Sequence, residues 1–294
     1  MKLLELKDYD LYQQYYRRCN YSLSNYNFYN MLMFASWVEV SYVIDNDIMY
    51  LFGKYQNEYY AYMPLCGNDR FVEGLLFIKE YLNNLNCKVK FACFDEEHYH
   101  QVLKIFKTCN ANSTYDSSDY VYDFVSLQTF SGKKMQKKRN LINNFLKNYE
   151  YQWEKIDDIE KVKEFNDWWF DNHHQMYLDH DLKATNYILD NYDKCFGVSG
   201  IVIKVDEKVI GYIIGSMLNE NTIQIHIQKA NDEYIGIYQL LFKTYFSMYS
   251  NIKLVNLEDD LGLENLRHSK ESYHPVMLIN KYQICTNKGE MNLV

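Results

Sequence analysis

The chain has 294 residues, of which 48% are hydrophobic, so it can bury one large core or two ordinary ones and is not a disordered protein. Its formal net charge of −8 argues against a surface devoted to nucleic acid, because phosphate binding relies on lysine and arginine. The seven cysteines are odd in number and include no C-x-x-C pair, which argues against a disulfide framework and a zinc knuckle.

The N-terminal sequence MKLLELKDYD turns acidic before the apolar core of a signal peptide forms. Further along the chain, no uninterrupted apolar stretch approaches the roughly 18 residues that a membrane-spanning helix needs. We therefore expect a cytoplasmic protein without a transmembrane segment.

The first half predicts a meander of three strands followed by a helix, a strand, a helix and a strand. Residues 35–65 alternate apolar and polar side chains and are interrupted by the turn sequences DND and KYQNE. Residues 69–86 have an acidic start and apolar residues at near-helical spacing. The remaining elements are a short buried strand at 88–94, a helix at 95–109 and a closing strand at 120–127.

A basic segment, residues 131–148, follows and predicts an amphipathic helix. Its apolar stripe contains Met135, Ile142, Phe145 and Leu146, and its basic residues lie largely off that stripe. Two interpretations stay open, a solvated helix packed across both halves and an anion site at the positive end of the helix dipole. A strand at 149–156 and a helix at 157–174 come next.

The second half repeats the order of the first. Residues 197–230 predict another three-strand meander, with turns at DEK and NEN. A helix at 236–249, a buried strand at 251–257, a helix at 262–273 and a terminal strand at 276–284 follow. The repeated order indicates duplication of one mixed-sheet unit. We predict an α/β (α+β mixed-sheet) protein with an N-terminal domain at 1–130, a connecting helix at 131–149 and a C-terminal domain at 150–294.

Two stretches, SDYVYDFVSLQTFSGKKMQKKRNLINNF and VNLEDDLGLENLRHSKESYHPV, resemble the phosphatidylglycerol lysyltransferase C-terminal-like family. The order of strands and helices is similar to a tandem pair of GNAT-type (acyl-CoA N-acyltransferase) folds. The resemblance covers nearly the whole chain and is strongest over 119–145 and 226–276. It implies transfer of an acyl or aminoacyl group from an acyl-CoA or aminoacyl-tRNA donor to an amine or hydroxyl acceptor.

The polar run at 256–275 follows a predicted central strand, where open α/β sheets commonly hold ligands. Acyl transfer needs a base, and Glu258 or His226 is the candidate, while Tyr273 resembles the tyrosine that GNAT enzymes use as a general acid. The resemblance implies substrate binding at Asp259, Asp260, Arg267 and Lys270. Capping of the following helix by Asp259 or Asp260 is an equally good interpretation.

Donor binding is expected at the basic helix and at the start of the helix at 236–249, and tRNA is the macromolecular partner that the basic helix would suit. The residues concerned are Lys133, Lys134, Arg139, Asn140 and Gly236. We expect no metal ion, because the histidine- and aspartate-rich run HHQMYLDHD has no metal-ligand spacing.

A noncatalytic protein that binds a metabolite or partner is the alternative. Leu257 and Gln228 stand where family members often have a basic residue and a carboxylate, and Gly236 is alone where GNAT enzymes present several loop glycines. The intact EDDLG and LRHSKESYHP sequences favour the enzyme.

Overall fold

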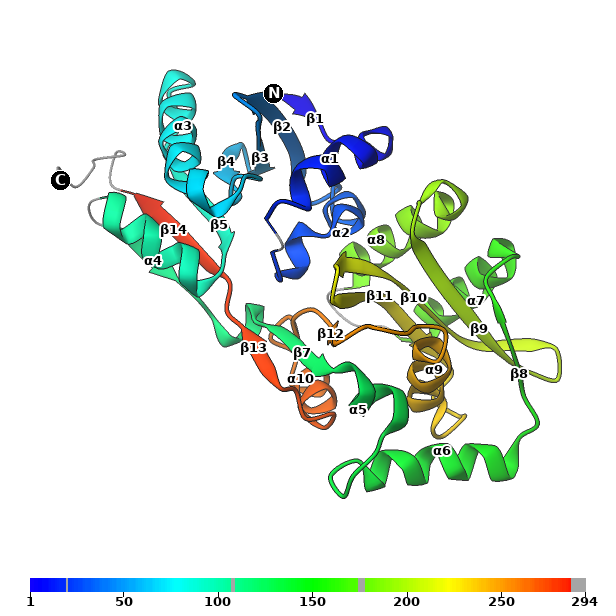
Figure 1. The fold of residues 1–294 in the computed structure, drawn as a ribbon. Coiled ribbons are helices and arrows are strands. Elements are labelled where there is room, and N and C mark those ends of the chain that lie inside the picture. The colour runs from blue at the N-terminus through cyan, green and yellow to red at the C-terminus, as the bar shows by residue number, and fades with distance from the viewer. Residues whose placement is uncertain (20, 107–108, 174–177, 287–294) are drawn as a thin grey trace. The chain divides into compact units, whose positions relative to one another are not determined.

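The computed structural model describes residues 1–19, 21–106, 109–173 and 178–286 (Figure 1). The chain forms two compact units. Residues 1–119 and 279–294 make up the first unit, and residues 120–278 make up the second.

A seven-stranded mixed sheet forms the first unit, with the order β1-β2-β3-β4-β5-β14-β6. Its strands are β1 (Lys2–Leu3), β2 (Glu39–Asp45), β3 (Ile48–Tyr55), β4 (Glu58–Ala61), β5 (Lys90–Phe94), β6 (Cys109–Asn112) and β14 (Tyr282–Thr286). Its helices are α1 (Tyr9–Tyr16), α2 (Phe28–Met33), α3 (Phe71–Asn84) and α4 (Glu96–Ile105). β4 and β5 are parallel, and the predicted meander is the antiparallel series β2-β3-β4.

The second unit contains another seven-stranded mixed sheet, with the order β13-β7-β12-β11-β10-β9-β8. Its strands are β7 (Asp119–Asp123), β8 (Gln152–Lys155), β9 (Val198–Val205), β10 (Lys208–Asn219), β11 (Thr222–Ala230), β12 (Leu254–Asn256) and β13 (Met277–Ile279). Its helices are α5 (Phe124–Thr129), α6 (Gln136–Asn148), α7 (Ile159–Asn172), α8 (Leu178–Asp190), α9 (Ile237–Phe246) and α10 (Glu264–Glu271). The predicted mixed α/β architecture with two similarly built sheets is confirmed.

Helices cover both faces of the second sheet. Because side chains alternate along a strand, Tyr212 and Ile213 of β10 point to opposite faces. The hydroxyl of Tyr212 donates to Asn166 of α7, whereas Ile213 belongs to the apolar core that includes Leu241 of α9. α7, with α8 packed on it, therefore covers one face, and α9, with α5 and α6 packed on it, covers the other (Figure 1).

Two strands have partners that the sequence analysis did not predict. The strand predicted to close the first half is β7, which lies in the second sheet between β12 and β13. The predicted terminal strand is divided into β13 and β14, and β14 lies in the first sheet between β5 and β6. Each sheet therefore contains one strand from the chain segment predicted to belong to the other half. An apolar pattern specifies which face a strand buries, but it does not specify the neighbouring strand.

Several helix boundaries also differ from the prediction. The strand predicted at 120–127 ends at Asp123, whose Oδ1 accepts a hydrogen bond from the backbone N–H of Ser126 (2.8 Å) and caps α5. The basic helix begins at Gln136 rather than at 131. Met135, Ile142 and Phe145 are buried as expected, but Leu146 is exposed. Within the described ranges, no helix is long and apolar enough to cross a bilayer.

Candidate functional site

The two parallel strands at the centre of the second sheet part from each other. β11 and β12 pair over only three residues each, from Thr222 and Leu254 to Gln224 and Asn256. β12 then ends, whereas β11 continues to Ala230. The residues that follow the last pair therefore lie beside the point where the sheet opens.

A β-bulge places His226 at this point. Ile214 of β10 is opposite Ile227, and the next residue, Gly215, is opposite Ile225, so His226 is the extra residue of the bulge. The His226 side chain has no exposed surface. Its Nε2 lies 2.8 Å from Oγ of Ser216, and its Nδ1 lies 3.7 Å from Oε1 of Glu258.

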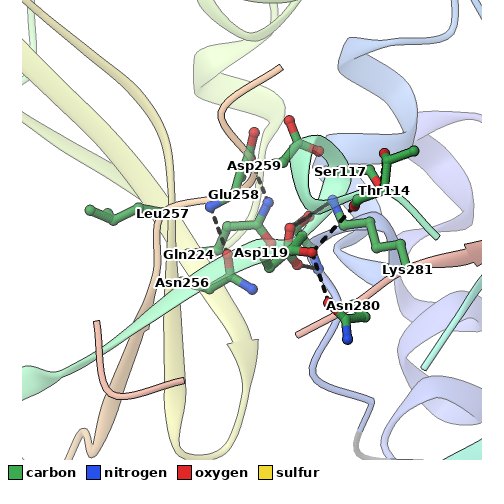
Figure 2. A network of polar contacts seen from close by, with 12 residues as sticks. Thr114, Ser117, Asp119, Gln224, Asn256, Leu257, Glu258, Asp259, Asn280 and Lys281 are labelled. Carbon is green, nitrogen blue, oxygen red and sulfur yellow. Dashed lines mark hydrogen bonds and ion pairs between the residues drawn. The ribbon is translucent and has the colours of Figure 1, made fainter. Parts of the chain in front are cut away.

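Glu258 approaches from the loop after β12. Its backbone is left-handed, with φ of 60°, and its N–H donates to Oδ1 of Asn256 (2.7 Å). Its Oε1 accepts a hydrogen bond from Nε2 of Gln224 (2.6 Å), as Figure 2 shows. Gln224 and Asn256 are completely buried, but the Glu258 side chain keeps 22% of its surface exposed. Glu258 is therefore the member of this cluster through which a substrate can make contact.

Two buried polar atoms beside Glu258 have no hydrogen-bond partner among the described residues: Oε1 of Gln224 and Nδ1 of His226. Buried polar atoms in folded proteins are usually hydrogen-bonded, and exceptions often have a functional role. Nδ1 of His226 faces the carboxylate of Glu258, and a role of the two side chains as a base stays a prediction.

Asp260 and Arg267, both predicted to bind substrate, contact each other. Asp260 is completely buried, and Arg267 donates to it through Nε (2.8 Å) and Nη2 (3.1 Å). The hydroxyl of Tyr120 (2.7 Å) and the N–H of Gly262 (2.9 Å) also donate to the Asp260 carboxylate. These contacts fix the loop that presents Glu258, and substrate binding by this pair stays a prediction.

Lys270 holds the same loop. Its ammonium donates to the carbonyl oxygen of Leu257 (2.6 Å) and to that of Asp259. Tyr120 of β7 pairs with the backbone of Leu257 and Glu258 on the other side, with both N···O distances at 3.0 Å. Lys270 therefore fixes the backbone before and after Glu258. Asp259 is half-buried, and its predicted role in substrate binding also stays a prediction.

We expect acid to lower the free energy of unfolding, because the Asp260 carboxylate that holds this loop becomes protonated. Burial raises the pKa of Asp260, but hydrogen bonds from Arg267, Tyr120 and Gly262 outweigh this effect and lower the pKa below its usual value. The stabilisation is therefore complete above the unfolded-state pKa of about 3.9 and is lost as the pH falls through the lower folded-state pKa. Urea unfolding between about pH 2 and 7 should show an acid-dependent loss that Asp260→Asn reduces. An unchanged acid dependence in this variant would contradict the assignment.

Tyr273 lies in the apolar core on the α9 side. Its hydroxyl accepts a hydrogen bond from Nε2 of Gln239 (2.6 Å), and its ring packs against Phe130 and Phe242. Burial raises the pKa of Tyr273 to about 12, which keeps the hydroxyl protonated at neutral pH. These contacts give Tyr273 a structural role, and its role as a general acid stays a prediction.

The predicted donor residues divide into exposed and structural ones. Lys133, Lys134 and Asn140 are exposed. Arg139 donates to the carbonyl oxygens of Phe130 and Gly132, and so it fixes the turn before α6. The turn before α6 therefore carries exposed lysines, and Arg139 holds this turn in place.

Gly236, the fifth predicted donor residue, is the N-cap of α9 and is required by packing. Its φ is 102°, and a Cβ atom at this position would lie 2.2 Å from the carbonyl oxygen of Leu141 in α6. α6 thus occupies the space beside the first turn of α9. A donor role for Gly236 stays a prediction.

Replacing Gly236 by alanine should lower the free energy of unfolding by about 2–4 kcal/mol, because backbone strain and a clash with α6 combine. Gly132 is the matched control, since its φ is also positive, at 85°, but a Cβ there would meet nothing within 4 Å. Gly132→Ala should lose only about 1 kcal/mol in the same urea titration. Equal losses at the two positions would show that the contact with α6 is unimportant.

Sequence reasoning missed Gln224 and Asn256. A signal was present in TIQIHIQKA, where polar residues alternate with isoleucines on a central strand whose faces are both covered. Gln228, at which the sequence departs from the family pattern, donates to the carbonyl oxygen of Tyr238 (2.9 Å) and so packs on α9.

The histidine-rich run contributes no metal-ligand group within the described ranges. His173 stacks on Trp169 with ring centroids 4.2 Å apart, and Asp181 pairs with Lys229 (2.6 Å). His174 lies outside the described residues.

Comparisons with known proteins agree with this architecture. An uncharacterized protein of Mycoplasmoides gallisepticum is 27% identical over 173 residues, which are 57% of this chain and 56% of that protein, so the match spans about half of the relative. A conserved protein of unknown function from Bacteroides thetaiotaomicron has a similar structure, with a TM-score of 0.90 and 23% identity over 96% of this chain and 98% of that one. L-PGS from Bacillus licheniformis has a TM-score of 0.68 and 17% identity over 97% and 93% of the two chains.

The model of the family described as "Phosphatidylglycerol lysyltransferase, C-terminal" matches residues 16–285. The family resemblance predicted from the sequence is confirmed, and so is the mixed α/β fold with two seven-stranded sheets. The chain belongs to the phosphatidylglycerol lysyltransferase C-terminal family.

Proposed function

We propose that this chain is an aminoacyltransferase that moves an aminoacyl group from aminoacyl-tRNA to an amine or hydroxyl acceptor. The observation that carries the proposal is the His226–Glu258 pair, held at 3.7 Å beside the point where β11 and β12 part. The family, named for a lysyltransferase, supports the same class of reaction.

The pair supplies what the reaction requires. The acceptor's nitrogen or oxygen attacks the carbonyl carbon of the donor ester, and the acceptor must lose a proton as the new bond forms. The His226–Glu258 pair takes this proton, and the departing ribose oxygen of the tRNA receives one in return. Gln224 and Asn256 orient Glu258 for this role, because both hold it by direct hydrogen bonds.

The basic helix favours tRNA as the donor over acyl-CoA. Lys133, Lys134 and Lys137 are exposed at or near the start of α6, where the helix dipole also attracts anions. The start of α9, by contrast, is packed against Leu141 of α6, and so it has less room for a pyrophosphate group. Charged tRNA is cytoplasmic, which agrees with the location that the sequence predicts.

The bound tRNA would approach the base from the other face of the sheet. α6 lies on the α9 face, whereas Ser216 shares the α7 face with Tyr212 because the two are an even number of residues apart along β10. β11 and β12 stop pairing after Gln224 and Asn256, and His226 lies on β11 two residues beyond this point.

A donor-consumption assay tests the proposal. Total tRNA charged with radiolabelled amino acids is incubated with the full chain, a panel of small amines and alcohols, and phosphatidylglycerol vesicles. Loss of label from the tRNA and its appearance on an acceptor are measured. Acetyl-CoA and longer acyl-CoAs are tested in parallel by thiol release.

We expect label to leave at least one aminoacyl-tRNA in the presence of an acceptor. Lys133→Glu combined with Lys134→Glu should weaken tRNA binding and reduce its salt dependence, whereas Lys243→Glu, an exposed lysine of α9, should not. If only acyl-CoA is consumed, the donor is an acyl-CoA and not an aminoacyl-tRNA. If neither donor is consumed with any acceptor, the protein is a noncatalytic binding protein.

A further inference from the structure

We propose that Ser216, His226 and Glu258 form a nucleophile–base–carboxylate series and that Ser216 carries the acyl group covalently between donor and acceptor. This inference deepens the proposed function and rests on it. It replaces direct attack by the acceptor on the donor with a transfer in two steps.

The geometry follows the order that an activated serine requires. Oγ of Ser216 lies 2.8 Å from Nε2 of His226, within hydrogen-bond distance. The opposite ring nitrogen, Nδ1, faces Oε1 of Glu258 at 3.7 Å. A nucleophile next to a base that a third group orients is the general signature of covalent catalysis, and the hydrogen bonds of such sites are often longer without substrate.

The carboxylate decides which nitrogen of the neutral imidazole carries the proton. A negative Glu258 stabilises an N–H at Nδ1 and repels a lone pair there, so Nε2 is left to accept a hydrogen bond from the Ser216 hydroxyl. In this arrangement His226 can remove the proton of Ser216. Glu258 then stabilises the imidazolium that forms.

The three residues come from segments that are held tightly. Ser216 lies on β10 directly after Gly215, where a Cβ atom would lie 2.6 Å from the carbonyl oxygen of Gln224. His226 is fixed by the bulge of β11, and Glu258 is held by Gln224 and Asn256. Positions on strands keep a site more precise than positions on loops.

In the first step, Oγ of Ser216 bonds to the carbonyl carbon of the aminoacyl ester while the serine proton moves to Nε2 of His226. The bond between that carbon and the ribose oxygen of the tRNA breaks, and the imidazolium gives its proton to the departing oxygen. In the second step, the acceptor attacks the acyl-serine and gives its proton to Nε2. The Ser216 ester bond breaks, and Oγ regains the proton. No oxidant, reductant or further reactant is consumed.

Burial of the nucleophile suits an ester intermediate. Ser216 is only 4% exposed and the His226 side chain has no exposed surface, so bulk water is kept from the acyl-serine. Exclusion of water from an active site limits hydrolysis of reactive intermediates.

The test uses a small serine-directed reagent, diisopropyl fluorophosphate, on the full chain. We expect one adduct per chain by intact mass, located on the peptide that contains Ser216. Ser216→Ala should remove the adduct, and His226→Gln should slow labelling by at least tenfold. Ser269→Ala, which changes an exposed serine of α10, should be labelled like the unchanged protein.

A second experiment looks for the intermediate itself. The protein is mixed with charged tRNA without acceptor, quenched in acid and measured by mass spectrometry, and an aminoacyl adduct on Ser216 is expected. Ser216→Cys should give a thioester at the same position, and circular dichroism confirms that each variant folds.

The outcomes separate this inference from the proposed function. Donor consumption at an unchanged rate by Ser216→Ala, without an adduct in the unchanged protein, overturns the covalent route and leaves the transferase standing. An adduct of diisopropyl fluorophosphate on Ser216 without consumption of any donor would support Ser216 as a nucleophile and contradict aminoacyl transfer. The absence of adducts in both experiments overturns the inference.

Discussion

Replacing Glu258 by glutamine is expected to slow acyl transfer by about 10²–10⁴-fold without unfolding the protein, because an amide of the same shape keeps the packing but can neither accept a proton nor stabilise an imidazolium. The carboxylate already accepts a hydrogen bond from Gln224 (2.6 Å), and the 22% exposed surface tolerates the neutral group. Donor consumption measured over a range of donor concentrations should show the loss in kcat more than in KM.

Glu264 provides the matched control, because it is an exposed glutamate in the first turn of α10. Glu264→Gln should keep its rate within about twofold, as expected of a surface residue outside the site. His226→Gln should be as slow as Glu258→Gln, and the double variant should be little slower than either single one, because the residues act as a unit. Additive losses, or a fall in unfolding free energy that accounts for the lost rate, would contradict this assignment.

The order of the elements was predictable because it depends on local patterns. The alternation in 197–230 and the turn sequences DEK and NEN predict the meander that β9, β10 and β11 form. The position of Glu258 directly after a buried strand was enough to propose it as a base, since chain order alone places it at the carboxyl end of β12.

The surroundings of Glu258 depend on contacts that the sequence does not contain. The bulge that brings His226 to Ser216 results from the register between β10 and β11, and the local pattern TIQIHIQ is compatible with regular pairing. Gln224 and Glu258 are 34 residues apart and meet because β11 and β12 are parallel. A pattern of residues gives the faces of these strands, but it does not give their register.

The polar run at 256–275 also shows why a residue type does not give a role. Asp260, Arg267 and Lys270 are charged and lie in the stretch that resembles the family, which made them candidates for substrate binding. Arg267 donates to Asp260, and Lys270 donates to the carbonyl oxygens of Leu257 and Asp259. Charged side chains next to an active site often have the task of holding the loop that presents the catalytic group.

A second large effect, on the free energy of unfolding, is expected at the two segments where the chain passes from one sheet to the other. The first unit contains a buried ion pair at the places where the chain leaves and re-enters it: Lys281 Nζ lies 2.6 Å from Asp119 Oδ1 (Figure 2). The backbone N–H of Ser24 (2.6 Å) and its hydroxyl (2.9 Å) also donate to Asp119. The Asp119 side chain has no exposed surface and that of Lys281 only 8%, so neither charge can be solvated if its partner is removed.

Lys281→Met should therefore lower the free energy of unfolding by about 3–5 kcal/mol, because it leaves the carboxylate of Asp119 buried without its counter-charge. Urea denaturation followed by circular dichroism measures the loss. Lys88→Met, at an exposed lysine of the same unit, should change the value by less than about 0.5 kcal/mol.

Adding Asp119→Asn to Lys281→Met should restore about half or more of the loss, since the neutral amide can still accept from Ser24 and no unpaired charge remains. This recovery separates the penalty of an unpaired buried charge from a simple loss of packing, which the second substitution could not repair. A loss below about 1 kcal/mol for Lys281→Met would show that the ion pair does not stabilise the segments at which the chain leaves and re-enters the first unit. A double variant that is less stable than each single variant would show the same.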